Sequence, residues 1–575
     1  QPIFNASRDV AVVFNGEIYN FTEVKDLLRK NGHTFLSNGD AEVLPHAYEE
    51  WGMPGMLTRL RGMFAFALWD QKRESLFLVR DRLGVKPLCY AVTPDSMEFA
   101  SEPHALGCFQ QCAGKVDLDG LDSYLSLGYT DMHANFVKGV MSVSPACYLE
   151  VQNGTVREYK YWSLPEIILD RPRPSFQQYI EEADGLILNA VERRMKSDVP
   201  LGVFLSSGID SSLVVAYASQ SSTGPIKTFT VDFTDSPRAE SQNESELAAQ
   251  VASRYGTDHK ILRVGADSIG SLPRLVHNVS EPFADPSLLS TYMICKAARE
   301  DITVALTGDG GDESFAGYSN VNVARLTDVF MGWCPTYIRK PIFELLLEMS
   351  PDSPWISKLR TLFKYGTNDL RHIYDNPQLW NRKIREKLLA ETNGNSDLRL
   401  PFKGRLDQFE QSLTRKLAYV DFNLRLPCGY LKKVDIASSS LSMEIRSPFL
   451  DQELVEYMWN VPDELKMYKG RQKGFLRHLA SNYLPESVVR RRKTGFSPPI
   501  SEWLRTRWRP ILIQLVENSL AKRKGYFRPD IIRDQIDDHL SQRRDNGMRL
   551  WQLICLEVWF QIFVDRTLKP DDSLF

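Results

Sequence analysis

The sequence predicts an α+β domain built on antiparallel sheets, followed by an α/β domain with a parallel sheet and a helical C-terminal part. Short β-type runs separated by turn residues fill residues 8–110, whereas apolar strands alternate with helices over residues 201–308. The 575 residues also exceed the roughly 100–200 residues of one ordinary domain. Prolines and charges interrupt the pattern at 163–175, so we expect domains over residues 1–162 and 176–575.

The first domain is predicted from four β-type segments and one helical stretch. The β-type segments are DVAVVFNGEIYN (9–20), GMFAFALWD (62–70), SLFLVRDR (75–82) and MEFASE (97–102). The helical stretch is TEVKDLLRKNG (22–32). Strands that follow one another across turn residues are typical of antiparallel sheets.

The second domain is predicted from strands and helices that alternate along the chain. The strands are LGVFLS (201–206), IKTFTVDF (226–233), KILRVG (260–265) and ITVALTG (302–308). The helices between them are SLVVAYASQ (212–220), SELAAQVASRYG (245–256) and TYMICKAARED (291–301). This alternation predicts a parallel sheet covered by helices, with ligand sites at the carboxyl ends of the strands.

Composition limits the possible partners and compartments. The chain is 43% hydrophobic and 25% charged, which is typical of a folded soluble protein, and its net charge of -3 offers no general attraction for nucleic acid or an anionic membrane. No apolar run approaches the ~20 residues of a membrane span, and the N-terminus lacks a signal layout, so we expect a cytoplasmic protein. Eight cysteines without a CxxC pair and nine histidines without HExxH argue against a disulfide scaffold and a structural metal site.

The loop FLSSGIDSS (204–212) joins a strand to a helix and has two interpretations. Its amides, its hydroxyls and the helix N-terminus suit a phosphate or pyrophosphate, and Asp210 would then need Mg²⁺ as a bridge. Alternatively, Asp210 or Ser211 only caps the helix. The loop lacks the lysine of a GxxxxGK[ST] motif, which disfavours that type of phosphoryl transfer.

A second loop, LTGDGGDESFAGY (306–318), favours the ligand-binding interpretation. Asp309, Asp312 and Glu313 lie among three glycines at a strand end, where acids usually require a cation and glycines permit close approach of a ligand. Lys473 lies on a helical segment and would matter only if the fold brings it to these loops.

Together these stretches resemble the asparagine synthetase family of glutamine-dependent amidotransferases over nearly the whole chain. The matching stretches of the second domain are 197–212, 307–318, 434–451, 470–485 and 491–504, and those of the first are NGEIYN (15–20), SNGDAEV (37–43), RLRGMFAFALWD (59–70) and RDRLGVKPL (80–88). The resemblance implies an N-terminal-nucleophile glutaminase domain, with antiparallel sheets between helices, followed by a pyrophosphatase-loop synthetase domain.

In the glutaminase domain, the resemblance assigns four residues to glutamine. Asn15 and Gly16 would form the oxyanion hole, where preorganised donors stabilise the tetrahedral intermediate. Glu17 and Asp40 would hold the α-ammonium group of glutamine. An isolated Asn-Gly pair is more often a hairpin turn, but the flanking motifs favour the functional assignment.

The chain departs from the family at its start. Glutaminases of this family use an N-terminal cysteine as nucleophile, whereas this sequence begins with Gln1, after the segment that carries that cysteine and an arginine clamp. None of the eight cysteines is N-terminal. We therefore expect a fragment of a longer protein, which as written does not hydrolyse glutamine.

In the synthetase domain, the resemblance implies that a carboxylate is adenylated by ATP, with magnesium, and that ammonia then attacks the acyl-adenylate. Asp309 and Lys473 would be catalytic, Asp210 and Asp312 would bind the metal, and Glu313 and Arg446 would belong to the acceptor pocket. The residues assigned to ATP and pyrophosphate are Leu205, Ser206, Ser207, Gly208, Asp210, Ser211, Val231, Thr307 and Gly308.

The acceptor acid that the resemblance favours is aspartate, which would be converted to asparagine. Asp309 stands where the best-known asparagine synthetases carry glutamate, so another acid, such as a sugar acid or a natural-product precursor, is an alternative. A catalytically silent relative is a third, against which the retained Asp210, Asp312, Glu313 and Lys473 argue. The expected partners are small molecules, with a homodimer possible and with no nucleic acid or membrane.

Ser207 replaces the glycine that is usual at its position in the family, and its hydroxyl can donate a hydrogen bond to pyrophosphate. Ser207→Gly is therefore expected to weaken product inhibition by pyrophosphate, measured as a higher inhibition constant in the ATP-dependent reaction. Unchanged inhibition would remove this role from Ser207.

Overall fold

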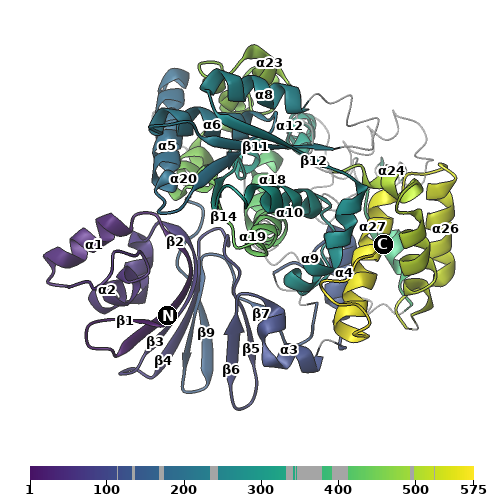
Figure 1. The fold of residues 1–575 in the computed structure, drawn as a ribbon, viewed down its shortest axis with the longest axis horizontal. Helices are drawn as coiled ribbons and strands as arrows, with labels where there is room; N and C mark the ends of the chain where they lie inside the picture. The colour runs from purple at the N-terminus through teal and green to yellow at the C-terminus, as the bar shows by residue number, and fades with distance from the viewer. Residues whose placement is uncertain are drawn as a thin grey trace.

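The computed structural model describes residues 1–112, 114–132, 136–166, 174–233, 244–331, 378–390, 412–491, 498–523 and 525–574, with a few isolated positions between 338 and 345. Residues 167–173 of the predicted boundary, Cys334 and residues 492–497 of the last matching stretch lie outside these ranges. An N-terminal β-rich part lies below a parallel-sheet part, and the C-terminal helices pack at one side (Figure 1).

The N-terminal part is a pair of antiparallel sheets, as predicted. The larger sheet has the order β1-β2-β3-β4-β8-β9 and the smaller has the order β6-β5-β7. The strands are β1 (Ile3–Phe4), β2 (Val10–Ile18), β3 (Gly62–Asp70), β4 (Ser75–Arg80), β5 (Cys89–Val92), β6 (Met97–Ala100), β7 (Met141–Ser142), β8 (Cys147–Gln152) and β9 (Thr155–Lys160).

Each face of the larger sheet buries its own set of apolar side chains. Phe64, Phe66 and Leu68 of β3 pack with helices α1 (Phe21–Lys30) and α2 (Val43–Arg59). Ala65 and Ala67, which alternate with them, pack toward the smaller sheet. The period of two along β3 therefore places helices on one face and a second sheet on the other.

The prediction of a single helical stretch within residues 8–110 was wrong, because α2 also lies there. Besides α1 and α2, the structure has α3 (Gly107–Cys112) and α4 (Leu118–Leu127). Helix α2 is interrupted at Gly52, with φ of 65°, and contains Pro54, so its sequence contains helix-breaking residues. Its buried side chains hold both halves against the sheet despite this break.

The second sheet is parallel, as predicted, and has the order β12-β11-β10-β13-β14. Its strands are β10 (Leu201–Phe204), β11 (Lys227–Phe233), β12 (Asp258–Val264), β13 (Val304–Leu306) and β14 (Glu444–Arg446). The chain crosses from one side of β10 to the other between β12 and β13, which is the topological switch point at which such sheets bind ligands. The loops 205–208 and 307–310 both leave the sheet at this point.

Helices cover both faces of the parallel sheet. One face packs with α5 (Phe176–Met195), α6 (Ile209–Ser221), α8 (Glu244–Tyr255), α20 (Gln452–Asn460) and α22 (Gly474–Ala480). The other face packs with α10 (Ser287–Ala298) and α19 (Leu431–Ser439). Ser175 and Gln178 form a capping box that starts α5 just after the predicted boundary.

The C-terminal region is mainly helical, as predicted, and surrounds five fully buried tryptophans: Trp380, Trp503, Trp508, Trp551 and Trp559. The remaining α-helices of the described ranges are α9 (Leu272–Val279), α11 (Gly311–Ser314), α12 (Ser319–Met331), α16 (Arg382–Leu388), α18 (Leu413–Val420), α21 (Asp463–Lys466), α23 (Glu486–Arg490), α24 (Ile500–Arg505), α25 (Arg509–Leu512), α26 (Pro529–Leu540) and α27 (Gly547–Trp559). A π-helical segment, η3 (Asp421–Tyr430), joins α18 to α19.

Helix α4 belongs by packing to this C-terminal region. The Tyr124 hydroxyl donates to the Gln552 carbonyl at 2.7 Å, and the Gln552 amide donates back to the Tyr124 carbonyl at 2.8 Å. The segment Gly547–Val564 has the length and mean hydropathy, 1.2, of a membrane span, but 78% of it is buried inside the fold. Its partners in the structure are therefore other parts of the chain.

Candidate active site

The first strand-end loop folds around its own serine hydroxyls. Ser211 Oγ lies 2.8 Å from Ser206 Oγ and accepts the Ser206 amide at 3.0 Å, while Ser206 Oγ accepts the Gly208 amide at 3.1 Å. Helix α6 begins at Ile209, three residues before the predicted helical stretch 212–220. The loop amides and the helix N-terminus thus lie together, an arrangement that suits an anion.

Glycines let the second loop approach the first. A side chain at Gly308 would come within 2.7 Å of the Ser211 amide nitrogen, and one at Gly311 would come equally close to Asp210 Oδ1. Gly310, with φ of +89°, precedes the short helix α11. Gly308 and Gly311 are therefore explained by contact with the first loop, whereas Gly310 faces Leu450 and Phe449.

Lys473 joins the two loops from a third segment of the chain. Its Nζ forms ion pairs with Asp210 and, at 2.7 Å, with Asp312 Oδ1. Burial opposes the charge of Lys473, but the two carboxylates outweigh it and raise the pKa of Lys473 above its ordinary value. Lys473 precedes α22 in the left-handed conformation, with φ of 53°, which is uncommon for a residue with a side chain.

The donor set at this point fits magnesium. Asp210 and Asp312 present carboxylate oxygens from two different loops to one cavity, and Mg²⁺ prefers such hard oxygen ligands. These two residues would hold the ion when it is bound, and the ion would supply positive charge next to the phosphates.

Thirteen of the predicted synthetase residues line one cavity of about 1440 Å³. They are Leu205, Ser206, Ser207, Gly208, Asp210, Ser211, Val231, Thr307, Gly308, Asp309, Asp312, Glu313 and Lys473. Asp309 is held by the Thr307 hydroxyl, which donates to its Oδ2 at 2.8 Å. Ser207 is 3% exposed and does not have a positive φ, so serine fits this backbone without strain.

Glu313 is buried behind the loop and accepts the Tyr318 hydroxyl at 2.6 Å. Burial, with a smaller contribution from Asp312, raises the pKa of Glu313 to about 8. Burial thus favours the neutral form of the Glu313 carboxyl.

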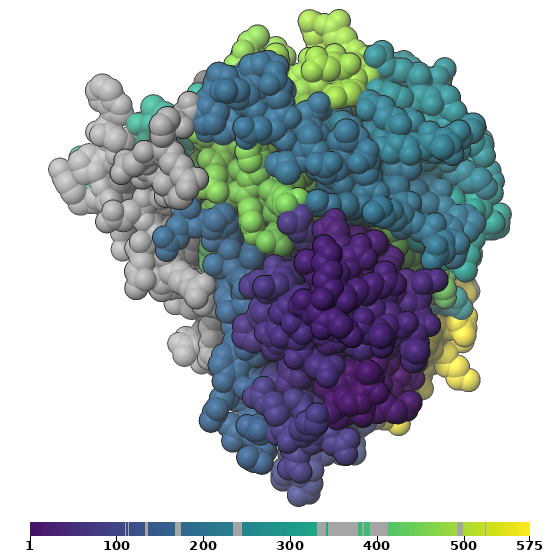
Figure 2. All heavy atoms as spheres, turned by 90° about the vertical axis from the view of Figure 1, so that its left-hand side faces the viewer, coloured from purple at the N-terminus to yellow at the C-terminus, as the bar shows by residue number. Residues whose placement is uncertain are grey.

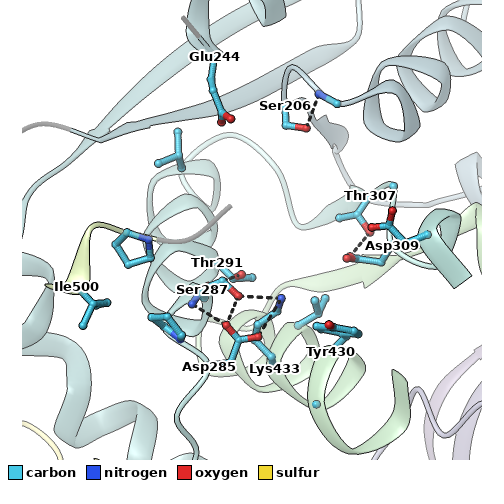
Figure 3. Close-up of a pocket in the computed structure, with 18 of the residues that line it drawn as sticks. Ser206, Glu244, Asp285, Ser287, Thr291, Thr307, Asp309, Tyr430, Lys433 and Ile500 are labelled. Atoms are coloured by element: carbon cyan, nitrogen blue, oxygen red, sulfur yellow. Dashed lines mark hydrogen bonds and ion pairs between the residues drawn. The ribbon is translucent and has the colours of Figure 1, made fainter. Parts of the chain in front are cut away.

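A polar cluster that the sequence analysis missed lies at another side of the same cavity (Figure 3). Asp285 Oδ1 accepts the Ser287 amide at 2.9 Å and its hydroxyl at 2.6 Å. Lys433 Nζ donates to Ser287 Oγ at 3.0 Å and lies 3.8 Å from Asp285 Oδ2. Asp285 comes just before helix α10 and does not follow a strand, so the strand-end rule could not find it.

Arg446 does not line this cavity, in contrast to the predicted acceptor pocket. It is buried between the two parts, where its guanidinium donates to the carbonyls of Arg194 and Lys196 and pairs with Glu444 at 2.5 Å. Its Nη2 also lies 3.2 Å from Glu17 Oε2 of the N-terminal part. Alternation along β14 turns Ile445 toward the cavity and Arg446 away from it.

The four residues predicted to bind glutamine lie on or beside strand β2. Gly16 has φ of +148°, and a side chain there would come within 2.1 Å of the Met63 carbonyl oxygen, so this position requires glycine. Asp40 Oδ2 accepts the Ile18 amide at 2.9 Å, and burial raises the pKa of Asp40. Burial also raises the pKa of Glu17 to about 7, although Arg446 opposes the change. Two such carboxyls suit a cationic ligand, whose charge would favour their ionised forms.

A smaller cavity of about 130 Å³ lies between the two parts and has Asn15, Cys89 and Lys432 in its lining. Burial raises the pKa of Cys89 to about 12, so this thiol is not a thiolate at neutral pH. Residues that are adjacent in the sequence line the two cavities: Thr130, Cys428 and Lys432 face the smaller one, while Tyr129, Gly429 and Lys433 face the larger.

Replacing Lys473 tests the loop junction. Lys473→Ala leaves two carboxylates without their shared cation, so we expect a loss of about 10²-fold in ATP-dependent pyrophosphate release and a lower melting temperature. Lys469→Ala is the control, because Lys469 also has positive φ, 56°, but is exposed. Equal rates for the two variants would contradict the role of Lys473.

Glu17 should make stability depend on pH. Its pKa of about 7 in the folded chain exceeds the ordinary 4.5, so the native state retains a proton that the unfolded chain loses, and stability falls as the pH rises through this window. Glu17→Gln does not lose stability in this way. The melting temperature of Glu17→Gln minus that of the wild type should therefore increase by roughly 1–3 °C when the pH is raised from 5 to 8. The exposed Glu23→Gln should show no such trend.

Comparisons with known proteins agree with this geometry. The family model described as asparagine synthase matches residues 182–561, and the one described as glutamine amidotransferase domain matches residues 1–162. The chain is 29% identical to asparagine synthetase [glutamine-hydrolyzing] 1 of Bacillus subtilis over 576 residues, covering 100% of this chain and 88% of that protein. It is 24% identical to amidase chyE of Penicillium rubens, covering 96% and 86% of the two chains.

Among solved structures, the glutamine phosphoribosylpyrophosphate amidotransferase from B. subtilis aligns with 45% of this chain, and the alignment covers 48% of that enzyme. The two are 16% identical, and the TM-score of 0.21 shows little overall structural similarity. The two family models together cover both parts of the chain and support glutamine-dependent amidation of a carboxylic acid with ATP. With its strand-end loops, Lys473 and the matched residues 182–561, this chain belongs to the asparagine synthase family.

Proposed function

We propose that the protein converts L-aspartate to L-asparagine with ATP and with ammonia derived from glutamine, which its glutamine amidotransferase domain, residues 1–162, would bind. The observation that carries this proposal is the junction of loops 205–211 and 307–313 through Lys473. Backbone amides that suit an anion, two carboxylates that would bind the metal and a buried cation thus lie together in the lining of one cavity. The synthetase domain is proposed to span residues 176–575, and the compartment to be the cytoplasm.

In the first step, a carboxylate oxygen of the acceptor attacks the α-phosphorus of ATP, and the bond to pyrophosphate breaks. Ser206, Ser207, Gly208 and Ser211 would bind the leaving pyrophosphate, and Lys473 would balance its developing charge. Leu205, just after β10, and Val231, within β11, are both buried and would contact the adenine, with Thr307 and Gly308 beside the ribose and α-phosphate.

In the second step, ammonia attacks the acyl carbon, AMP leaves, and the nitrogen loses a proton. Asp309 would accept that proton, because its carboxylate faces the cavity and the Thr307 hydroxyl fixes its orientation. The smaller cavity next to Asn15 supports an enclosed path for ammonia, because Lys432 lines it while the adjacent Lys433 lines the larger cavity.

An α-amino acid acceptor is supported by the cluster of Asp285 and Lys433. A carboxylate and an ammonium group side by side match the two charges of a zwitterion, whereas a sugar acid offers no ammonium for Asp285. The name of the Penicillium relative, an amidase, keeps another acceptor as the alternative.

The experiment measures pyrophosphate release from ATP with ammonium chloride as the nitrogen source. Release should require L-aspartate and should not occur with succinate, which lacks the α-ammonium group. Lys433→Ala and Asp285→Asn should raise the KM for aspartate about tenfold or more, with a smaller effect on the KM for ATP.

Lys296→Ala, an exposed lysine on the same helix as Ser287, is the matched control and should leave both KM values unchanged. Release that proceeds equally with succinate would exclude the zwitterion cluster as the acceptor site. An absence of release with any acid would instead favour the silent relative.

A further inference from the structure

We propose that the N-terminal domain has a binding site for one Zn²⁺ ion, formed by His33, His46 and Glu49. Nothing in the asparagine synthase chemistry requires this site, and the sequence pattern, which has no HExxH, argued against a structural metal. The fold brings the three residues together from the start of the loop after α1 and from the first two turns of α2.

The separations of the three donor atoms match a common metal ion. His33 Nδ1 and His46 Nδ1 are 3.2 Å apart, and Glu49 Oε2 is 4.0 Å from each of them. A point equidistant from three atoms with these separations lies about 2.2 Å from each, close to the roughly 2.0–2.2 Å of Zn–N and Zn–O bonds. Two imidazoles and one carboxylate are also a donor set that favours Zn²⁺ over Mg²⁺ or Ca²⁺.

A neighbouring carboxylate supports the required tautomer of His33. Glu50 Oε2 lies 3.1 Å from His33 Nε2, and Glu50 Oε1 in turn accepts the Asn31 side-chain amide at 2.8 Å. A carboxylate at this position places the imidazole proton on Nε2 and leaves the Nδ1 lone pair for a ligand. His46 is 2% exposed and packs against Phe35, so its ring is held in place before any ion binds.

Without a metal ion, the same two rings can form an Nδ1–H···Nδ1 hydrogen bond. This alternative accounts for the 3.2 Å separation of the rings but does not involve Glu49, which is 42% exposed and free to choose other rotamers. The charge of Glu49 therefore distinguishes a metal site from a hydrogen bond between the two rings, because only the metal site requires that charge.

The proposed ion would link the two ends of the loop that carries Asp40. His33 and His46 lie on either side of residues 34–42, where Glu42 accepts the amides of Leu36 and Ser37 at 2.6 and 2.7 Å. Figure 2 views the side of the molecule that lies at the left in Figure 1, where α1 and α2 form the purple surface of the N-terminal part. Glu49 is exposed, so solvent can reach the site and would provide the fourth ligand as water.

The test uses the full chain, freed of metals with a chelator and then titrated with ZnCl₂ in a calorimeter. We expect one Zn²⁺ per chain, with a dissociation constant of micromolar or below and a higher melting temperature, while MgCl₂ has no such effect. Glu49→Gln should weaken binding by about 10-fold and His33→Gln by about 100-fold, and both should lose the increase in melting temperature.

Asp26→Asn, an exposed acid on α1, is the control and should bind like the wild type. If His33→Gln fails to fold, Glu49→Gln still decides, because its side chain is exposed and only the metal site needs its charge. The proposal is overturned if the wild type binds no Zn²⁺, or if Glu49→Gln and His33→Gln bind it as tightly as Asp26→Asn does.

Discussion

The contact of Lys473 with Asp210 and Asp312 is the interaction on which the arrangement of the synthetase part depends. A lysine that is 6% exposed would be destabilising without compensation, and the two carboxylates would repel each other without it. The three residues come from the loop after β10, the loop after β13 and the start of α22. Their mutual attraction therefore fixes three distant segments at one point.

Small residues around this point make such close packing possible. A side chain at Gly317 would come within 2.0 Å of Asp312 Oδ1 and within 2.3 Å of Lys473 Cε. Gly308 and Gly311 likewise leave room for the first loop. The glycines thus serve the contact between protein segments as much as the approach of a phosphate.

Ion pairs connect the N-terminal part of the chain to the parallel-sheet part. The carbonyl of Arg446 accepts the Thr307 amide of the nucleotide loop at 3.0 Å, while its guanidinium reaches Glu17 of the N-terminal part. Lys86 of the N-terminal part pairs with Asp435 of α19 at 2.8 Å, and both side chains are nearly buried. A displacement of Glu17 would therefore act on a residue that holds Thr307.

The two fold classes and the strand-end position of both loops follow from the sequence, because strand periodicity and loop chemistry are local properties. The thirteen predicted residues of the larger cavity followed from the ordered motifs that resemble the family. Only the tertiary structure decided that Arg446 turns away from that cavity, that α4 packs with the C-terminal helices and that Asp285 and Lys433 join the site. The pairing of His33 with His46 was equally hidden. These outcomes depend on strand order, on which face of a short strand is buried and on contacts between residues far apart in the chain, and none of these can be read from a local pattern.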